Sequence, residues 1–178
     1  MKSIIITAAL LMAQSTMYAQ RLQARLDSLA AFYGETLDFN GSVLVYQKGK
    51  LLLNKAYGYQ NKALNIANTT DGIYLVGSVT KQFTAELVLM LAREGRLSLK
   101  DRLSKYYPEY AHADKITLEN MLTHTSGIFD YTHDSTWEPG IDKPVTDEQI
   151  FSLFWNKPLD FEPGTDWSYS NTNYQLLG

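Results

Sequence analysis

The stretch "SVTKQFTAELVLMLAREG", residues 78–95, decides how the middle of this chain folds. Its apolar residues recur at the three- and four-residue spacing of a helix, with Val79, Phe83 and Leu87 on one stripe. Further apolar residues, Val88 among them, occupy the other faces. A helix that is apolar on all sides is usually buried within its protein. We therefore expect a buried helix that begins near the first residue of this stretch.

Two polar residues at the start of this helix, Ser78 and Lys81, admit two interpretations. In the first, Ser78 is the N-cap and Lys81 is a solvated side chain. In the second, Ser78 is a nucleophile and Lys81 is its base, because residues three apart share one helix face. The helix dipole and desolvation both disfavour an ammonium there, so we expect a lowered pKa for Lys81, which suits a base. A Ser-x-x-Lys match arises about once by chance in such a chain, so the pair alone does not decide.

The composition is that of a globular chain with the length of one domain. The chain has 178 residues, of which 45% are hydrophobic, and a net charge of −3. This balance gives no sign of the basic patch that a nucleic-acid-binding protein would present. The sequence contains no Cys, which excludes disulfides and thiolate metal sites. No cluster of His and carboxylates has metal-ligand spacing, so we expect neither a metal nor another cofactor.

The first 19 residues have the pattern of a secretory signal peptide. Lys2 gives a positive start, residues 4–13 are apolar, and Ala19 is a small residue suited to cleavage. The apolar run is shorter than the roughly 20 residues that a membrane-spanning helix needs, which disfavours an uncleaved anchor. We therefore expect an exported protein, periplasmic or secreted, without a stable membrane span.

The remaining chain reads as a helix, a hairpin and a long, mostly helical stretch. Helical spacing predicts an amphipathic helix over Leu22–Tyr33 that stops at Gly34. Residues 41–57 predict a β-hairpin, residues 58–72 a loop and residues 73–76 a short strand. A lone hairpin is marginal and needs more strands or a covering layer. We therefore expect that the sheet is unfinished in this sequence and that the chain is a fragment.

Polar residues mark the starts of three further helices. Thr117 can cap a short helix that runs through Leu122. Thr146 and Gln149 have the spacing of a capping box. Asn171 can cap a last helix.

Four segments of this sequence resemble the serine β-lactamase and penicillin-binding protein superfamily, in its class C-like branch. They are "GSVLVYQKGKLLLNKAYGY" from Gly41, "GSVTKQFTAELVLMLAREGRLSLKD" from Gly77, "ITLENMLTHTSGIFDY" from Ile116 and "FEPGTDWSYSNTNYQLLG" from Phe161. Ser-x-x-Lys followed at a distance by Tyr-x-Asn, combined with His-Thr-Ser-Gly and Pro-Gly-Thr between them, makes the resemblance strong. The resemblance implies an α+β fold of the α/β-sandwich type. It has an antiparallel sheet flanked by helices plus an all-helical region, and the sheet is incomplete in this chain.

The resemblance also implies a role for four side chains. Ser78 would attack an acyl carbonyl and form a covalent ester, and its backbone N–H would be half of the oxyanion hole. Lys81 would take or relay the serine proton. Tyr169 would be the second member of this relay and would help to protonate the leaving group. Asn171 would hold the substrate amide by hydrogen bonds.

Plainer interpretations of these residues stay open at this point. Tyr169 can be a buried aromatic residue with its hydroxyl satisfied, although a nearby ammonium would lower its pKa and suit it to act as a base. Asn171 can be no more than a helix cap. His124 could be interpreted as the histidine of a catalytic Ser–His pair. Its neighbours suggest instead the end of a helix, closed by Gly127, so we favour a structural role.

The family has a third motif, Lys-Thr-Gly or His-x-Gly, on a strand that lines the site. The sequence ends before it could appear, and Lys157-Pro158-Leu159 is no substitute. Residues 20–178 would thus be the N-terminal part of a β-lactamase-related serine hydrolase domain that lacks the C-terminal strands and helix.

The resemblance implies an exported serine acyl hydrolase. Its substrate would be a small molecule or peptide: a β-lactam, a D-alanyl peptide of the cell wall, or an ester. One alternative is a non-catalytic cleft protein of the penicillin-binding type. The other is a truncated polypeptide that is inactive by itself.

Overall fold

A computed structural model describes residues 20–137 and 144–178, so the expected signal peptide lies outside the described residues. The chain divides into two compact units, Met1–Leu75 and Val76–Gly178. In the part of the chain that the structure describes, no helix combines the length and the hydropathy needed to cross a bilayer. The mixed α and β content agrees with the α+β fold expected from the sequence, with small antiparallel sheets and several helices.

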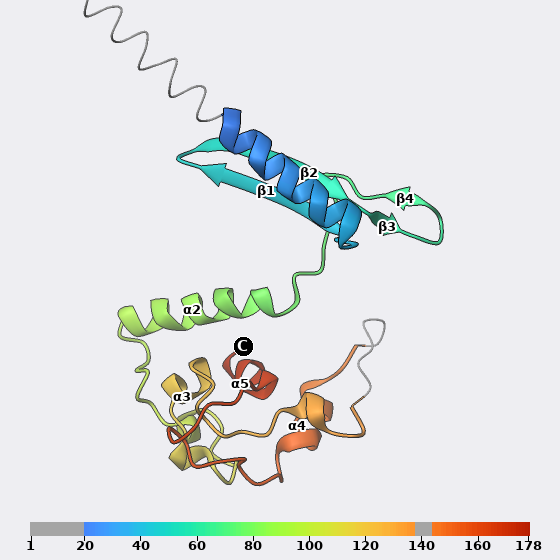
Figure 1. Cartoon of the computed structure of the whole chain (residues 1–178). Coiled ribbons are helices and arrows are strands. Elements are labelled where there is room, and N and C mark those ends of the chain that lie inside the picture. Colours follow the sequence, from blue (N-terminus) through green and yellow to red (C-terminus); the bar gives the residue numbers. More distant parts are fainter. Residues whose placement is uncertain (1–19, 138–143) are drawn as a thin grey trace, which may run out of the picture. The chain divides into compact units, whose positions relative to one another are not determined.

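The first unit is a hairpin covered on one face by a helix. Strands β1 (Gly41–Gln47) and β2 (Lys50–Tyr57) pair antiparallel, which confirms the predicted hairpin. The helix over residues 20–36 lies along this pair (Figure 1). Ala30 of the helix and Leu53 of β2 are buried. The helix thus provides the covering layer that a two-stranded hairpin needs.

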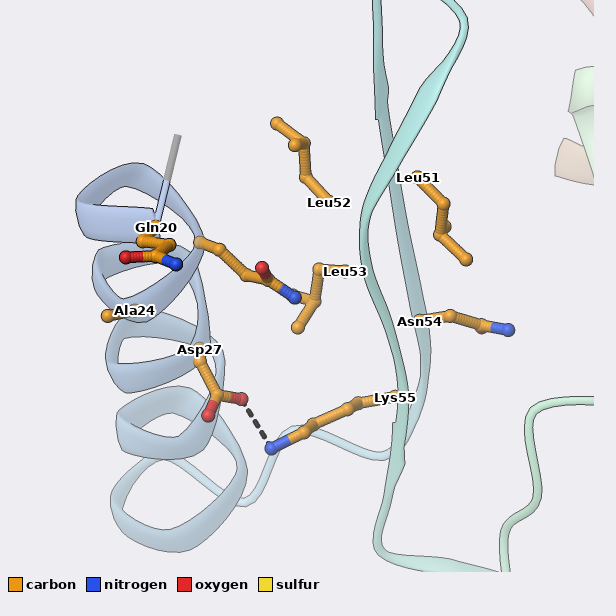
Figure 2. A pocket seen from close by; sticks show the side chains of 9 residues that line it. Gln20, Ala24, Asp27, Leu51, Leu52, Leu53, Asn54 and Lys55 are labelled. Carbon is orange, nitrogen blue, oxygen red and sulfur yellow. Dashed lines mark ion pairs between the residues drawn. The ribbon is translucent and has the colours of Figure 1, made fainter. Parts of the chain in front are cut away.

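The helix over residues 20–36 also faces β2 across an open pocket. Leu51, Leu53 and Lys55 of β2 line it, together with residues near the start of the helix (Figure 2). Asp27 and Lys55 form an ion pair at its edge. Both side chains are about half exposed, so this pair contributes little to stability.

Gly34 does not end the first helix as predicted, because the helix continues to residue 36. Tyr57 explains why a glycine stands there. A Cβ on Gly34 would lie 2.4 Å from the Tyr57 ring atom Cδ1, so the glycine lets the helix approach the hairpin. Packing, and not helix termination, accounts for this residue.

Two further predictions in the first unit are wrong. The predicted loop contains a small antiparallel pair, β3 (Tyr59–Asn61) and β4 (Ile66–Ala67). Its turn is stabilised by Asn61, whose side chain accepts a hydrogen bond from the Leu64 backbone N–H at 3.0 Å. The strand predicted over residues 73–76 is not formed in the described chain, because no neighbouring strand offers it an edge.

The second unit is mostly helical. Its longer elements are η1 (Gly77–Thr80), α2 (Lys81–Arg93), α3 (Leu118–Leu122), α4 (Asp147–Phe154) and α5 (Asn171–Leu177). Among the described residues between α2 and α4 lie three short 3-10 turns: η2 (Leu103–Lys105), η3 (Ala113–Lys115) and η4 (Tyr131–His133). Helix α5 packs against both α2 and α3 (Figure 1). The core beneath them includes the fully buried side chains of Leu103, Ile116, Met121 and Phe154.

Two of the three predicted helix caps are confirmed. Thr117 with Asn120, and Thr146 with Gln149, each form a capping box at the starts of α3 and α4. Asn171 is not a cap, because Ser170 holds that position and Asn171 is the first residue of α5. The side chain of Asn171 is therefore available for other contacts.

The prediction that α2 is buried on all sides is not confirmed within the second unit taken by itself. Val88 is its one buried residue, whereas Phe83 and Leu87 are 63% and 61% exposed. α5 packs on α2, so the second unit by itself covers one side of this helix.

Candidate active site

Ser78 lies in the 3-10 turn η1, which leads directly into α2. The N-cap of this turn is Val76, and no side chain caps it. The interpretation of Ser78 as an N-cap is therefore wrong. Its hydroxyl oxygen instead accepts hydrogen bonds from Lys81 Nζ at 3.2 Å and from the Tyr169 hydroxyl at 2.9 Å.

Lys81, the first residue of α2, is not simply solvated. Its ammonium donates to Ser78 Oγ and, at 2.8 Å, to the side-chain oxygen of Asn171. The first contact follows from the spacing of three residues, which places both side chains on one helix face. The second depends on α5, which brings Asn171 to the start of α2 across 90 residues of sequence. The four residues expected in the site thus lie together.

Tyr169 precedes α5 and points its hydroxyl at Ser78. Burial by itself would raise the pKa of this phenol. The polar interactions with Lys81 and Ser78 and the positive charge of Lys81 outweigh burial, so the pKa of Tyr169 falls below its ordinary value. Lys81 Nζ lies 5.1 Å from the centre of the Tyr169 ring. A phenol that ionises more easily beside a hydroxyl is suited to accept the proton of that hydroxyl.

Backbone hydrogen bonds between two distant motifs place Tyr169. In the Pro-Gly-Thr motif, the Gly164 N–H donates to the Thr125 carbonyl of the His-Thr-Ser-Gly motif at 2.8 Å. Further along the same segment, the Ser168 N–H donates to the His124 carbonyl at 3.0 Å. These two bonds fix the segment that ends at Tyr169. The contact between the two motifs, called the joint below, thus positions the Tyr169 side chain beside Ser78.

Gly127 allows this joint to close. It has a positive φ of 71° and its carbonyl accepts a hydrogen bond from the Asp160 N–H at 2.8 Å. A Cβ on Gly127 would lie 2.0 Å from the carbonyl oxygen of Phe161, which no side chain tolerates. The glycine is therefore required both by its left-handed backbone and by the neighbouring chain.

His124 supports the site from behind Tyr169. The two rings are stacked, with centroids 4.5 Å apart, and His124 Nδ1 accepts the Ser170 backbone N–H at 3.2 Å. Burial and the charge of Lys81 lower the pKa of His124, which favours the neutral form that can accept this bond. No hydrogen bond joins His124 to Ser78 among the described residues. These contacts agree with the structural role that the sequence favours for His124.

Two residues of the site have no role in the sequence-based prediction. Asp130, only 4% exposed, accepts a hydrogen bond from Asn171 Nδ2 at 3.0 Å. Its other oxygen accepts bonds from the backbone N–H and the hydroxyl of Thr132, both at 3.0 Å. The sequence does contain one signal for Asp130, which is a carboxylate within the apolar segment "GIFDY". Because a buried charge needs polar partners, such a residue is a candidate for contacts within a site.

The site opens into a depression of about 290 Å³. Its lining includes Ser78, Lys81, Tyr131, Asn171 and Gln175. In residues 20–137 and 144–178, no three His, Asp or Glu side chains gather as metal ligands.

Two curated relatives match this chain over most of its length. Protein flp of Staphylococcus aureus (strain MW2) is 36% identical over 143 residues, covering 77% of this chain and 28% of flp. Penicillin-binding protein 4* of Bacillus subtilis (strain 168) is 30% identical over 162 residues, covering 89% of this chain and 35% of that protein. The chain thus spans about a third of the length of these relatives.

Solved structures agree with the sequence comparison. A class C β-lactamase in complex with cefoxitin superposes with a TM-score of 0.71 at 27% identity, covering 90% of this chain and 44% of the enzyme. The D-amino acid amidase of Ochrobactrum anthropi superposes with a TM-score of 0.67 at 26% identity, covering 77% and 38%. The protein family described as Beta-lactamase matches residues 29–178.

Proposed function

This chain belongs to the β-lactamase family, and we propose that it carries the nucleophile and the proton relay of an exported serine acyl hydrolase. The observation that carries this proposal is the pair of donors on one oxygen: Lys81 Nζ at 3.2 Å and the Tyr169 hydroxyl at 2.9 Å from Ser78 Oγ. The relatives, which include an amidase, a β-lactamase and a penicillin-binding protein, support a serine hydrolase.

In the proposed reaction, Ser78 Oγ attacks the carbonyl carbon of an amide, β-lactam or ester. Its proton passes to Lys81 or Tyr169, whichever is deprotonated at that moment. The C–N or C–O bond then breaks, and Tyr169 gives a proton to the leaving group. Attack by water on the resulting Ser78 ester releases the acid and restores the serine.

Two further groups complete the proposed site. The backbone N–H of Ser78 lies in the first turn of the η1–α2 helix, where N–H groups lack intrahelical acceptors, so it can donate to the oxyanion. The Asn171 amide lines the depression beside Ser78 and can contact the substrate amide. We propose a β-lactam, a D-alanyl peptide or an ester as the substrate, because a β-lactamase and a D-amino acid amidase are among the relatives.

Export is part of the proposal and rests on residues 1–19. The periplasm or the exterior is where a cell-wall peptide would be met. Fractionation of cells that produce the natural protein tests this point. We expect the protein in the periplasm or the medium, shortened by its first 19 residues; recovery of the unprocessed chain in the cytosol would contradict export.

The test of the activity is turnover by the full-length natural protein with nitrocefin, a D-alanyl-D-alanine peptide and a p-nitrophenyl ester. We expect hydrolysis of at least one of the three, and its loss in Ser78→Ala. Turnover that persists in S78A would exclude Ser78 as the nucleophile. Binding of penicillin without turnover of any substrate would instead favour a non-catalytic cleft protein.

A further inference from the structure

The Asn171 side chain has a fixed orientation with its two ends on different partners. Its oxygen accepts from Lys81 Nζ at 2.8 Å. Its nitrogen donates to Asp130 Oδ2 at 3.0 Å and approaches Thr132 Oγ1 at 3.4 Å. The nitrogen thus faces two oxygen acceptors, and the oxygen faces a cation.

Asp130 is itself held in place. It is 4% exposed, and Thr132 donates both its backbone N–H and its hydroxyl to Oδ1 at 3.0 Å. This leaves Oδ2 directed at Asn171. An ionised carboxylate accepts hydrogen bonds and donates none, so only the NH₂ end of the Asn171 amide fits against it.

A rotation of the Asn171 amide by half a turn would be costly at both ends. It would set the amide oxygen against the Asp130 carboxylate, and the NH₂ group against the Lys81 ammonium. Each contact would then pair two acceptors or two donors in a partly buried site. The hydrogen bond to Asp130 therefore fixes the orientation of the Asn171 amide, so that its oxygen faces Lys81.

We propose that Asp130 is a positioning residue for the reaction. It orients the Asn171 amide, and the amide oxygen in turn holds the Lys81 amine beside Ser78 Oγ. The proposal rests on the proposed function, because it assumes that the position of Lys81 controls the reactivity of Ser78.

The test exchanges the two side chains, using the full-length natural protein. D130N sets one NH₂ group against another, and N171D sets two carboxylates at the same contact. The double variant D130N/N171D restores one amide donor against one carboxylate acceptor. It also leaves a carboxylate oxygen facing Lys81. If Asp130 acts through this hydrogen bond, the double variant should react at Ser78 faster than each single variant.

The rate measured is that of Ser78 labelling by a fluorophosphonate, followed by intact-protein mass spectrometry. This probe has no amide, so the rate reports on the serine and not on substrate binding by Asn171. We expect D130N and N171D to slow labelling at least tenfold each, since small misplacements in a site have effects of up to about a hundredfold. The double variant should recover to within about tenfold of the natural protein and label faster than both singles.

Two outcomes would overturn the proposal: labelling of D130N at the natural rate, or a folded double variant that labels no faster than the faster of the two single variants. Thermal unfolding of all four proteins separates a loss of fold from a loss of orientation. If D130N does not fold, the comparison of N171D with the double variant decides in the same way.

A second readout does not depend on activity. The side-chain NH₂ signal of Asn171 in an amide NMR spectrum, identified by its absence in N171D, should shift strongly in D130N, also in an S78A background. An unmoved signal would overturn the positioning role. Labelling that persists in S78A would instead contradict the proposed function and leave this second readout valid.

Discussion

At the scale of single residues, the Ser78 hydroxyl oxygen receives hydrogen bonds from Lys81 and from Tyr169. Tyr169 must carry its phenolic proton for this arrangement. For attack on a carbonyl, one of the two donors must first lose its proton and then take that of the serine. Because the pKa of Tyr169 is lowered, the phenol reaches its basic form at a lower pH than an ordinary tyrosine does.

Tyr169→Phe tests this relay and Tyr174→Phe is its matched control. The ring of Tyr174 also lies near the same histidine, with centroids 5.3 Å apart, but its hydroxyl donates to the Leu122 carbonyl at 3.1 Å and does not touch Ser78. We expect Y169F to lower kcat/KM by about 10²- to 10⁴-fold, the usual contribution of a positioned acid or base. Y174F should stay within a few-fold of the natural protein.

The pH profile separates a base from a mere contact. If Tyr169 acts as the base, kcat/KM rises with pH, and the midpoint of the rise lies below the ordinary tyrosine pKa because the pKa is lowered. This rise should vanish in Y169F. Equal profiles of the two proteins would show that the phenol does not carry the proton.

His124 predicts a dependence of stability on pH. Its pKa is lowered in the folded chain by burial and by Lys81, so the unfolded chain binds a proton more readily. The stabilisation is therefore fully present above the ordinary histidine pKa, about 6.5, and is lost as the pH falls through the lowered value. We expect the melting temperature to drop between pH 8 and pH 5.

His124→Asn is the control for this drop. Asparagine tolerates the positive φ of 59° at this position, and its side-chain oxygen can accept the Ser170 N–H. H124N has no titrating side chain at this position, so its melting temperature should fall less between pH 8 and pH 5 than that of the natural protein. An equal fall in both proteins would assign the effect to other groups.

Four residues of the site could be predicted from the sequence, whereas the carboxylate of Asp130, which binds Asn171, could not. Ser78 and Lys81 are three residues apart on a helix, so local geometry predicts their contact. That Tyr169 and Asn171 lie near Ser78 was predicted only from the resemblance to a family. Asp130 was missed because its contact with Asn171 spans 41 residues and follows no local spacing.

At the scale of elements, the joint between the His-Thr-Ser-Gly motif and the segment over residues 160–169 carries the site. At Gly127 the two segments approach so closely that a Cβ would lie 2.0 Å from the Phe161 carbonyl oxygen. The hydrogen bonds on either side of this contact set the path of the chain to Tyr169. A change at Gly127 should therefore affect both stability and activity.

Gly127→Ala and Gly95→Ala form a matched pair. Both glycines have nearly the same positive φ, 71° and 70°, but a Cβ on Gly95 meets nothing within 4 Å. G95A should cost only the left-handed backbone strain, roughly 1–2 kcal/mol. G127A adds a clash with main-chain atoms that cannot rotate away, so we expect a loss of about 4 kcal/mol or more.

Denaturant unfolding of the full-length natural protein and of both variants measures the difference. Rates of serine labelling should fall in G127A even where it remains folded, and should stay unchanged in G95A. Similar losses of stability in the two variants would contradict the close approach of Phe161.

Elements fixed by local chemistry were predicted well, and those fixed by distant contacts were not. The capping boxes at Thr117 and Thr146 involve residues three apart, and both are formed. The strand predicted over residues 73–76 needed a partner, and the burial predicted for α2 needed neighbours on all its faces. Apolar sequence alone does not report whether such neighbours are present.

At the scale of the whole molecule, most of the length of the relatives lies outside the region they share with this chain. The chain spans 28% of flp and 35% of penicillin-binding protein 4*. Within the second unit taken by itself, the side chains of Phe83 and Leu87 of α2 are exposed. Exposed apolar side chains on neighbouring turns of a helix are unfavourable in water.

We therefore propose that residues 20–178, produced alone, are inactive. The family's third motif, which would supply the second oxyanion donor, is not in this sequence. Circular dichroism on heating and turnover of a chromogenic ester test this expectation. A cooperative unfolding transition together with turnover would show that these residues form a complete site by themselves.

We propose that Ser78 forms a covalent acyl-enzyme with the help of Lys81. Intact-protein and peptide mass spectrometry of the full-length natural protein, treated with a penicillin or a fluorophosphonate, can detect this adduct and locate it. We expect one adduct, located on the peptide that contains Ser78, absent in Ser78→Ala and formed at least a hundredfold more slowly in Lys81→Ala. An adduct that forms at the natural rate in S78A, or that maps to another peptide, would contradict this proposal.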